Sequence, residues 1–218
     1  IGWIHELLGI KVEEGNQVAI DGKSLRGSGT KRNRMVHLLH AFLVEQECIL
    51  AQKKTAEKSN EITAIPELLE ILDLKGAIVS IDAMGCQTDI AKKIIEKEAD
   101  YFLAVKENQK TLYEDITTAF LVFPERNDNT FTTEEMNGSR IEKRTCKVID
   151  DLTHLKNPEQ WMGLKKIIKI ETQTYLKSEQ KEVKDSRYYI ASFEASPQRY
   201  LEVSRNHWAI ENKLHWSL

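Results

Sequence analysis

The 218-residue chain has no run of about 18 consecutive apolar residues, the length that a membrane-spanning helix needs. It also lacks a basic segment followed by an apolar stretch, the mark of a secretion signal. Its three cysteines, Cys48, Cys86 and Cys146, are far apart and odd in number. This pattern excludes a CxxC-type zinc site and suits a reducing compartment. We therefore expect a cytoplasmic protein with no membrane partner.

The composition is that of an ordinary globular protein, with 41% hydrophobic and 30% charged residues. The length allows one substantial core, or a core with an inserted lobe. The formal net charge of −3 neither favours nor excludes nucleic acid, because the total would hide a local basic patch. The chain begins with Ile1 and stops at Leu218 while a helical pattern is still running, so we interpret it as a fragment.

Hydrophobic patterning predicts an α/β fold. In order, it indicates strands at 17–21, 35–44 and 48–53, a helix at 60–72, a strand at 76–82, a helix from Thr88, a strand at 101–105 and a helix from Thr111. Thr111 and Glu114 have the spacing of a capping box. Residues 124–139 have a loop composition, residues 139–193 turn to strands, and Ser196-Pro197 is typical of a helix start. This order matches a ribonuclease H-like mixed sheet flanked by helices, with a β-rich insertion before the last helix.

Three acids stand in apolar surroundings. Asp21 and Asp82 each close a short apolar run that is typical of a buried strand, and Glu211 lies in the amphipathic last helix. Burying several carboxylates is costly unless a cation neutralises them, and Mg²⁺ prefers carboxylate oxygens. Spacing alone still favours a simpler interpretation. Aspartates commonly end strands at turns, helical glutamates commonly face water, and 34 acids offer many such triples.

The residues around these acids resemble those of a known protein family. Residues 18–27 (VAIDGKSLRG), 81–87 (IDAMGCQ) and 207–212 (HWAIEN) closely resemble successive blocks of the DDE transposases of the H-repeat-associated (ISAs-type) group of bacterial insertion sequences. Residues 57–69 and 100–109 match further blocks, and the resemblance covers roughly residues 17–218. It implies that Asp21, Asp82 and Glu211 are the catalytic acids and that they bind Mg²⁺ or Mn²⁺, as two ions.

The resemblance also implies a reaction and partners. Such an enzyme hydrolyses a phosphodiester at the end of the mobile element, and the freed 3′-hydroxyl then attacks target DNA. Its partners would be transposon-end DNA and target DNA, bound by a homodimer or larger synaptic complex associated with the bacterial nucleoid. Ser204, His207 and Leu218 stand where related transposases often carry tyrosine, arginine and lysine.

The resemblance divides the chain into four segments. Residues 1–16 would be a leader or linker from a missing N-terminal helical domain, and 17–123 the first part of the catalytic core. Residues 124–195 would form the β-rich insertion, which would shield DNA or mediate assembly. Residues 196–218 would be the truncated final core helix.

Several polar residues near the acids are candidates for binding nucleic acid. Lys23, Arg26, Lys31, Arg32 and Arg34 follow Asp21 with no acid between them. They form either a solvated basic loop or a contact for the DNA backbone. Gly22-Lys23-Ser24 suggests a P-loop, but that motif needs a glycine five residues before Gly22. Gln17 occupies that position, so the motif is excluded.

Four further candidates lie beside the other two acids. Lys106 and Asn108 follow a strand, where active-site loops often lie, although a polar turn explains them equally. His207 and Trp208 precede Glu211 on the last helix. His207, Glu211 and His215 share a helix face, but no further His or Cys motif completes a zinc shell.

Two other functions stay open. The first is a nuclease of the same fold that acts on RNA–DNA hybrids or DNA junctions without strand transfer. The second is a non-catalytic remnant that only binds DNA or a protein.

Overall fold

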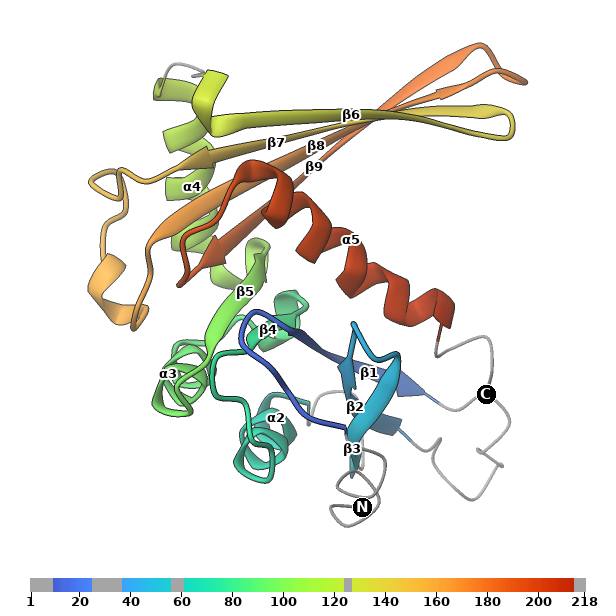
Figure 1. Ribbon diagram of the computed structural model, residues 1–218. Coiled ribbons are helices and arrows are strands. Elements are labelled where there is room, and N and C mark those ends of the chain that lie inside the picture. The colour runs from blue at the N-terminus through green and yellow to red at the C-terminus, as the bar shows by residue number, and fades with distance from the viewer. Residues whose placement is uncertain (1–9, 25–36, 56–60, 124–126, 214–218) are drawn as a thin grey trace, which may run out of the picture.

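The computed structural model describes residues 10–24, 37–55, 61–123 and 127–213 (Figure 1). The strands are β1 (Gln17–Ser24), β2 (His37–Leu43), β3 (Cys48–Thr55), β4 (Ile78–Ile81), β5 (Asp100–Val105), β6 (Thr130–Asn137), β7 (Arg140–Ile149), β8 (Lys166–Leu176) and β9 (Lys181–Ala191). The α-helices are α2 (Glu61–Glu70), α3 (Thr88–Glu96), α4 (Lys110–Val122) and α5 (Pro197–Lys213). The 3-10 helices are η2 (Ala83–Gly85), η3 (Glu107–Gln109), η4 (Asn127–Asn129) and η5 (Pro158–Gln160). Within these ranges, no helix is both long enough and apolar enough to cross a bilayer.

The described strands form one mixed sheet in the order β3-β2-β1-β4-β5-β9-β8-β7-β6. β1, β4 and β5 are parallel neighbours, joined by crossovers that contain α2 and α3. β2 and β3 extend the sheet as an antiparallel hairpin on one side, and β9 to β6 extend it antiparallel on the other. The predicted mixed sheet flanked by helices is confirmed.

Apolar residues cover both faces of the sheet. The central strand β4 is buried along its whole length, as expected for a strand with helices on both sides. One core holds the apolar faces of α2, α3 and α4 against residues such as Val18, Ile20 and Val79. The other core packs Tyr200 and Val203 of α5 onto the opposite face. Among the described α-helices, α5 alone therefore lies on its side of the sheet (Figure 1).

Three local predictions were wrong. Residues 124–139 are not all loop, because β6 pairs with β7 along its whole length. β6 is polar and partly exposed, and its threonines favour extended backbone although they also occur in loops. β1 does not end at Asp21 but continues to Ser24, since β2 pairs with it as far as His37. Thr111 does not cap α4, which begins one residue earlier and whose N-cap, Gln109, makes no side-chain cap hydrogen bond.

The predicted helix start at Ser196-Pro197 is confirmed. α5 begins at Pro197, and the Arg199 backbone N–H donates to Ser196 Oγ at 3.3 Å. A hydroxyl at this position satisfies an N–H group that has no partner within the helix. The sequence signal was strong here because cap and proline occur together.

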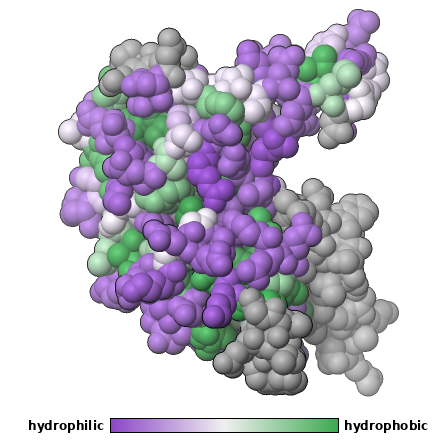
Figure 2. Space-filling model, in the orientation of Figure 1, coloured by the Kyte–Doolittle hydropathy of each residue, from purple (hydrophilic) through white to green (hydrophobic). Residues whose placement is uncertain are grey.

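The long strands β6 to β9 give the molecule its uneven outline. Their distal ends project beyond the helices as a twisted ribbon (Figure 1). Below the projecting ends the surface is hollowed, and much of the described wall is hydrophilic (Figure 2). α5 runs from the base of this ribbon toward the strands β1 and β2 (Figure 1).

Candidate catalytic site

The structure brings Asp21 and Asp82 together. β1 and β4 are adjacent parallel strands, and Ile20 is the register partner of Ile81. Asp21 directly follows Ile20, and Asp82 directly follows Ile81. Both aspartates are half-buried. Neighbouring strands lie about 4.8 Å apart, so the two acids stand side by side. The pairing register therefore supplies the convergence that two separate strand patterns could only suggest.

Both aspartates belong to the face of the sheet that α5 covers. Gln17 Nε2 donates to Ser80 Oγ at 2.8 Å and to the Val203 carbonyl of α5 at 2.9 Å. Side chains two residues apart on a strand share a face. Asp21 follows Gln17 by two such steps and Asp82 follows Ser80 by one, with extended backbone at Asp82 (φ −66°, ψ 177°). The acids therefore face the side on which α5 lies.

One oxygen of Asp82 is already engaged by the backbone. Asp82 is the N-cap of η2, and its Oδ1 accepts hydrogen bonds from the N–H groups of Met84 (3.0 Å) and Gly85 (3.3 Å). These bonds hold the carboxylate in one orientation at the end of β4. They leave Oδ2 as the oxygen to offer to a cation.

Amide side chains from η3 brace the turn that follows Asp82. Asn108 Nδ2 donates to the Ala83 carbonyl at 2.6 Å. Gln109 Nε2 donates to the Cys86 carbonyl at 2.9 Å. The segment after β5 thus supports the segment after β4, and Asn108, predicted to contact nucleic acid, takes part in this support.

His207 lies on the inner side of α5. Its Nδ1 is 3.1 Å from Ser80 Oγ, two residues before Asp82. Burial lowers the pKa of His207 to about 4, although the Asp82 carboxylate acts in the opposite direction. The imidazole is therefore neutral near pH 7, and it is turned toward the sheet rather than toward solvent.

Glu211 lies one helical turn beyond His207 on α5. Its backbone belongs to the helix, but its side chain is outside the described part of the structure. His215, the third residue of the weighed zinc-like face, is outside the described residues altogether. Among the side chains that are described, no group of three or more His, Cys, Asp or Glu could hold a metal ion.

The chemistry of the acids fits a hard divalent cation. Two carboxylates on adjacent strands repel each other, and a cation between them relieves that repulsion. Oxygen ligands are those that Mg²⁺ and Mn²⁺ prefer, whereas no cysteine or histidine set for zinc is found among the described residues. Glu211 would supply the third carboxylate from α5.

The predicted nucleic-acid contacts divide into two groups. Arg26, Lys31, Arg32 and Arg34 lie outside the described residues. Lys23 is on β1, two residues after Asp21, and is partly buried. Lys106 is exposed before η3. Trp208 is 38% exposed on α5.

Two arginines that the sequence analysis did not single out lie beside α5. The Arg187 guanidinium of β9 stacks on the Trp208 ring, 4.5 Å from its centroid. Arg205 of α5 donates two hydrogen bonds to the Glu135 carboxylate of β6, at 2.5 and 3.0 Å. These contacts depend on how β9 and β6 lie next to α5, and no local sequence signal could have revealed them.

The chain is similar in sequence to several known proteins. The sequence profile of the transposase DDE domain matches residues 13–218. "Putative transposase YncI" of Escherichia coli O157:H7 is 41% identical over 229 aligned residues, which cover 100% of this chain and 57% of that protein. "H repeat-associated putative transposase YhhI" of Escherichia coli K12 is 41% identical over 212 residues, covering 92% of this chain and 55% of that protein.

The chain thus spans little more than half the length of these relatives. The profile match nevertheless includes Asp21, Asp82 and the whole described part of α5. The chain belongs to the transposase DDE domain family.

Proposed function

We propose that this chain is the catalytic domain of a transposase that cleaves DNA at the ends of an insertion sequence and joins it to target DNA. The observation that carries the proposal is the register of β1 and β4. It sets Asp21 beside Asp82, on the face that α5 covers. The element order up to α4, with three strands and then alternating helices and strands, supports a ribonuclease H-like core.

Asp21, Asp82 and Glu211 would hold two Mg²⁺ or Mn²⁺ ions. Bound there, the ions supply activation of the attacking oxygen and stabilisation of the leaving oxygen in an in-line displacement. The chain's own residues orient the ligands: backbone N–H groups fix Asp82, and η3 supports the turn after it. Because hydrolysis and strand transfer are both in-line displacements, one such site serves both steps.

Positive and aromatic side chains near the acids would bind the DNA. Lys23 lies on the strand of Asp21, and Arg26, Lys31, Arg32 and Arg34 continue from it in sequence. Lys106 and Trp208 are exposed near the ends of β5 and α5. Phosphate contacts position DNA without reading its sequence, so these residues would serve both end DNA and target DNA.

Residues 124–195 would form an insertion that shields DNA or mediates assembly. Their long projecting strands border the hollow in Figure 2, which supports such a use. A homodimer or larger complex would be needed to hold two transposon ends at once.

The test is a cleavage and joining assay on DNA that carries the ends of the element, with Mg²⁺ and the full-length protein. Asp82→Asn keeps an oxygen acceptor for Met84 and Gly85 but removes the charge. Residues that only support metal ligands typically contribute about 10- to 100-fold to activity. Because Asp82 is a proposed ligand itself, we expect Asp82→Asn to lower the cleavage rate by more than about 100-fold. Asp73→Ala is the matched control, because Asp73 is exposed and precedes β4 at the opposite end of the strand.

The outcomes separate the open functions. Cleavage that survives Asp82→Asn contradicts the catalytic assignment. Cutting without joining indicates a nuclease, and binding of DNA without cutting indicates a non-catalytic remnant.

A further inference from the structure

Every fourth residue along one ridge of α5 contacts the strands beneath it. Arg199 Nη2 donates to the Gly15 carbonyl at 2.9 Å, just before β1. One turn later, the Val203 carbonyl accepts from Gln17 Nε2 at 2.9 Å. After another turn, His207 Nδ1 meets Ser80 Oγ at 3.1 Å. Residues four apart form a continuous ridge on a helix, and Glu211 is the next residue on this one.

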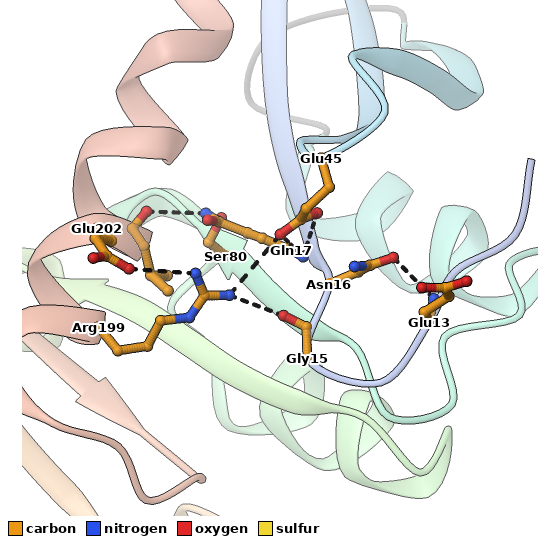
Figure 3. A network of polar contacts seen from close by, with 9 residues as sticks. Glu13, Gly15, Asn16, Gln17, Glu45, Ser80, Arg199 and Glu202 are labelled. Carbon is orange, nitrogen blue, oxygen red and sulfur yellow. Dashed lines mark hydrogen bonds and ion pairs between the residues drawn. The ribbon is translucent and has the colours of Figure 1, made fainter.

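The first of these contacts belongs to a charged cluster at the start of α5 (Figure 3). Arg199 also lies 3.9 Å from a Glu45 carboxylate oxygen and 3.6 Å from Glu202. Both oxygens of Glu45 accept hydrogen bonds from the Gln17 backbone N–H, at 3.0 and 2.9 Å. This cluster fixes the beginning of α5 against β1.

The next contacts form a buried polar chain from β1 through β4 to α5. Gln17 and Ser80 are almost completely shielded from solvent, at 0% and 1% exposure. Gln17 Nε2 donates to Ser80 Oγ at 2.8 Å, and Ser80 Oγ in turn meets His207. Gln17 Oε1 is buried without a hydrogen-bond partner among the described residues. A buried acceptor without a partner lowers the stability of the fold, and an apolar residue at position 17 would avoid this cost. Stability alone therefore does not explain the glutamine.

The contact between Ser80 and His207 lies about as far from Asp82 along β4 as from Glu211 along α5. Two residues of strand advance about 6.6 Å, which is the step from Ser80 to Asp82. Four residues of helix advance about 6 Å, which is the step from His207 to Glu211. Val203 contacts Gln17, which is the register partner of Ile78, and His207 contacts Ser80, two residues further along β4. The helix and β4 therefore advance in the same direction. A contact between His207 and Ser80 therefore sets the Glu211 backbone level with Asp82.

We propose that Gln17, Ser80 and His207 are positioning residues that set the register of α5 along β1 and β4 and so hold Glu211 beside the two aspartates. This inference rests on the proposed function, since it gives Glu211 the role of a metal ligand. None of the three residues contacts DNA or metal in this scheme. They act through the helix that carries the acid.

The experiment measures Mn²⁺ binding to this chain by electron paramagnetic resonance, without DNA. Ser80→Ala and His207→Leu remove the polar contact between β4 and α5. We expect each to raise the dissociation constant for Mn²⁺ by about tenfold, as typical for residues that orient metal ligands. His207→Asn, whose amide can replace Nδ1, should restore binding to within about threefold of the wild-type value.

Tyr200→Phe is the matched control for a general loss of stability. Tyr200 is buried on α5, and its hydroxyl donates to the Phe193 carbonyl at 2.6 Å, but it lies three turns before Glu211. This variant should unfold at a lower temperature and bind Mn²⁺ like the wild type. Circular dichroism of every variant verifies that α5 and the sheet are folded.

Asp82→Asn separates the two proposals. If it abolishes Mn²⁺ binding while Ser80→Ala and His207→Leu bind normally, the metal site stands and the positioning role is wrong. If Asp82→Asn binds Mn²⁺ normally, the proposed metal site itself is wrong. If Tyr200→Phe weakens binding as much as Ser80→Ala, the effect is one of stability and the positioning role is again contradicted.

Discussion

Asp82 uses its two carboxylate oxygens differently. Oδ1 caps η2 by accepting from Met84 and Gly85, so it has a structural role that needs no metal. Oδ2 is the oxygen proposed for the cation. A substitution at this residue can therefore damage the fold and the site separately, and the two effects can be distinguished by the replacement chosen.

We predict that Asp82→Ala and Asp82→Asn differ in stability without metal. Alanine removes the cap, which typically lowers the free energy of unfolding by about 1 kcal/mol. Asparagine keeps an acceptor and removes a charge beside Asp21, so it should be at least as stable as the wild type. Urea unfolding followed by circular dichroism measures both values. Equal destabilisation by the two replacements would show that the cap contributes nothing.

Individual residues were predictable from the sequence to different degrees. Asp21 and Asp82 were noticeable as acids after apolar runs, but the family resemblance of the surrounding residues, not the strand pattern, made them catalytic candidates. The orientation of His207 could not, because its sequence neighbours only place it on a helix. Its inward direction follows from Ser80, which is 127 positions away in the chain. Burial of this kind is set by packing between distant segments.

At the scale of elements, α5 is tied to the projecting strands as well as to the central ones. Arg205 makes two hydrogen bonds to Glu135 of β6, and Arg144 of β7 contacts the same carboxylate at 3.3 Å. Hydrogen bonding by Arg205, together with charge attraction from both arginines, lowers the pKa of Glu135. These groups are partly exposed, so water screens the attraction.

We predict a small coupling between Arg205 and Glu135 in a double-mutant cycle with alanine. Exposed pairs typically give about 0.2–1 kcal/mol, and the two-bond geometry favours the upper part of that range. About 1 M NaCl should reduce it. Because the folded pKa of Glu135 is below the ordinary 4.5, the coupling is fully present above pH 4.5. It disappears as the pH falls through the lower folded value.

The pair Lys92–Glu96 on α3 is the control for this cycle. It has the same charges, but its atoms are 3.8 Å apart and both side chains are more exposed. Its coupling should be smaller than that of Arg205 and Glu135. If the two couplings are equal, the two-bond geometry of Arg205 and Glu135 adds nothing to an ordinary exposed ion pair.

Element types followed from the sequence wherever one period dominated. β4 is apolar except for Ser80, and Ile90, Ala91 and Ile94 form one stripe of α3, so both were predictable. β6 was missed because it is stabilised by its neighbour β7 rather than by an apolar face of its own. Pairing partners, and with them the order of nine strands, cannot be read from local periodicity.

At the scale of the whole described chain, β9 joins the two halves of the sheet. Ile190 pairs with Leu103 of β5 and with Ile167 of β8. Its side chain belongs to the core under α2, α3 and α4, whereas its neighbours Tyr189 and Ala191 belong to the core under α5. The projecting strands therefore belong to the same sheet as β1, which contains Asp21, and β4, which directly precedes Asp82.

We predict that this continuity makes the sheet one cooperative unit. Ile190→Ala removes a fully buried side chain, which typically lowers the free energy of unfolding by about 2–5 kcal/mol. Amide hydrogen exchange followed by mass spectrometry should then accelerate in β1 and β4 as much as in β7 and β8, because both exchange through the same opening. Val183→Ala, at a 43% exposed site on β9, should change the free energy of unfolding by no more than about 0.5 kcal/mol. If Ile190→Ala accelerates exchange in β7 and β8 alone, the projecting strands open independently. In that case they could move relative to Asp21 and Asp82 without disturbing them.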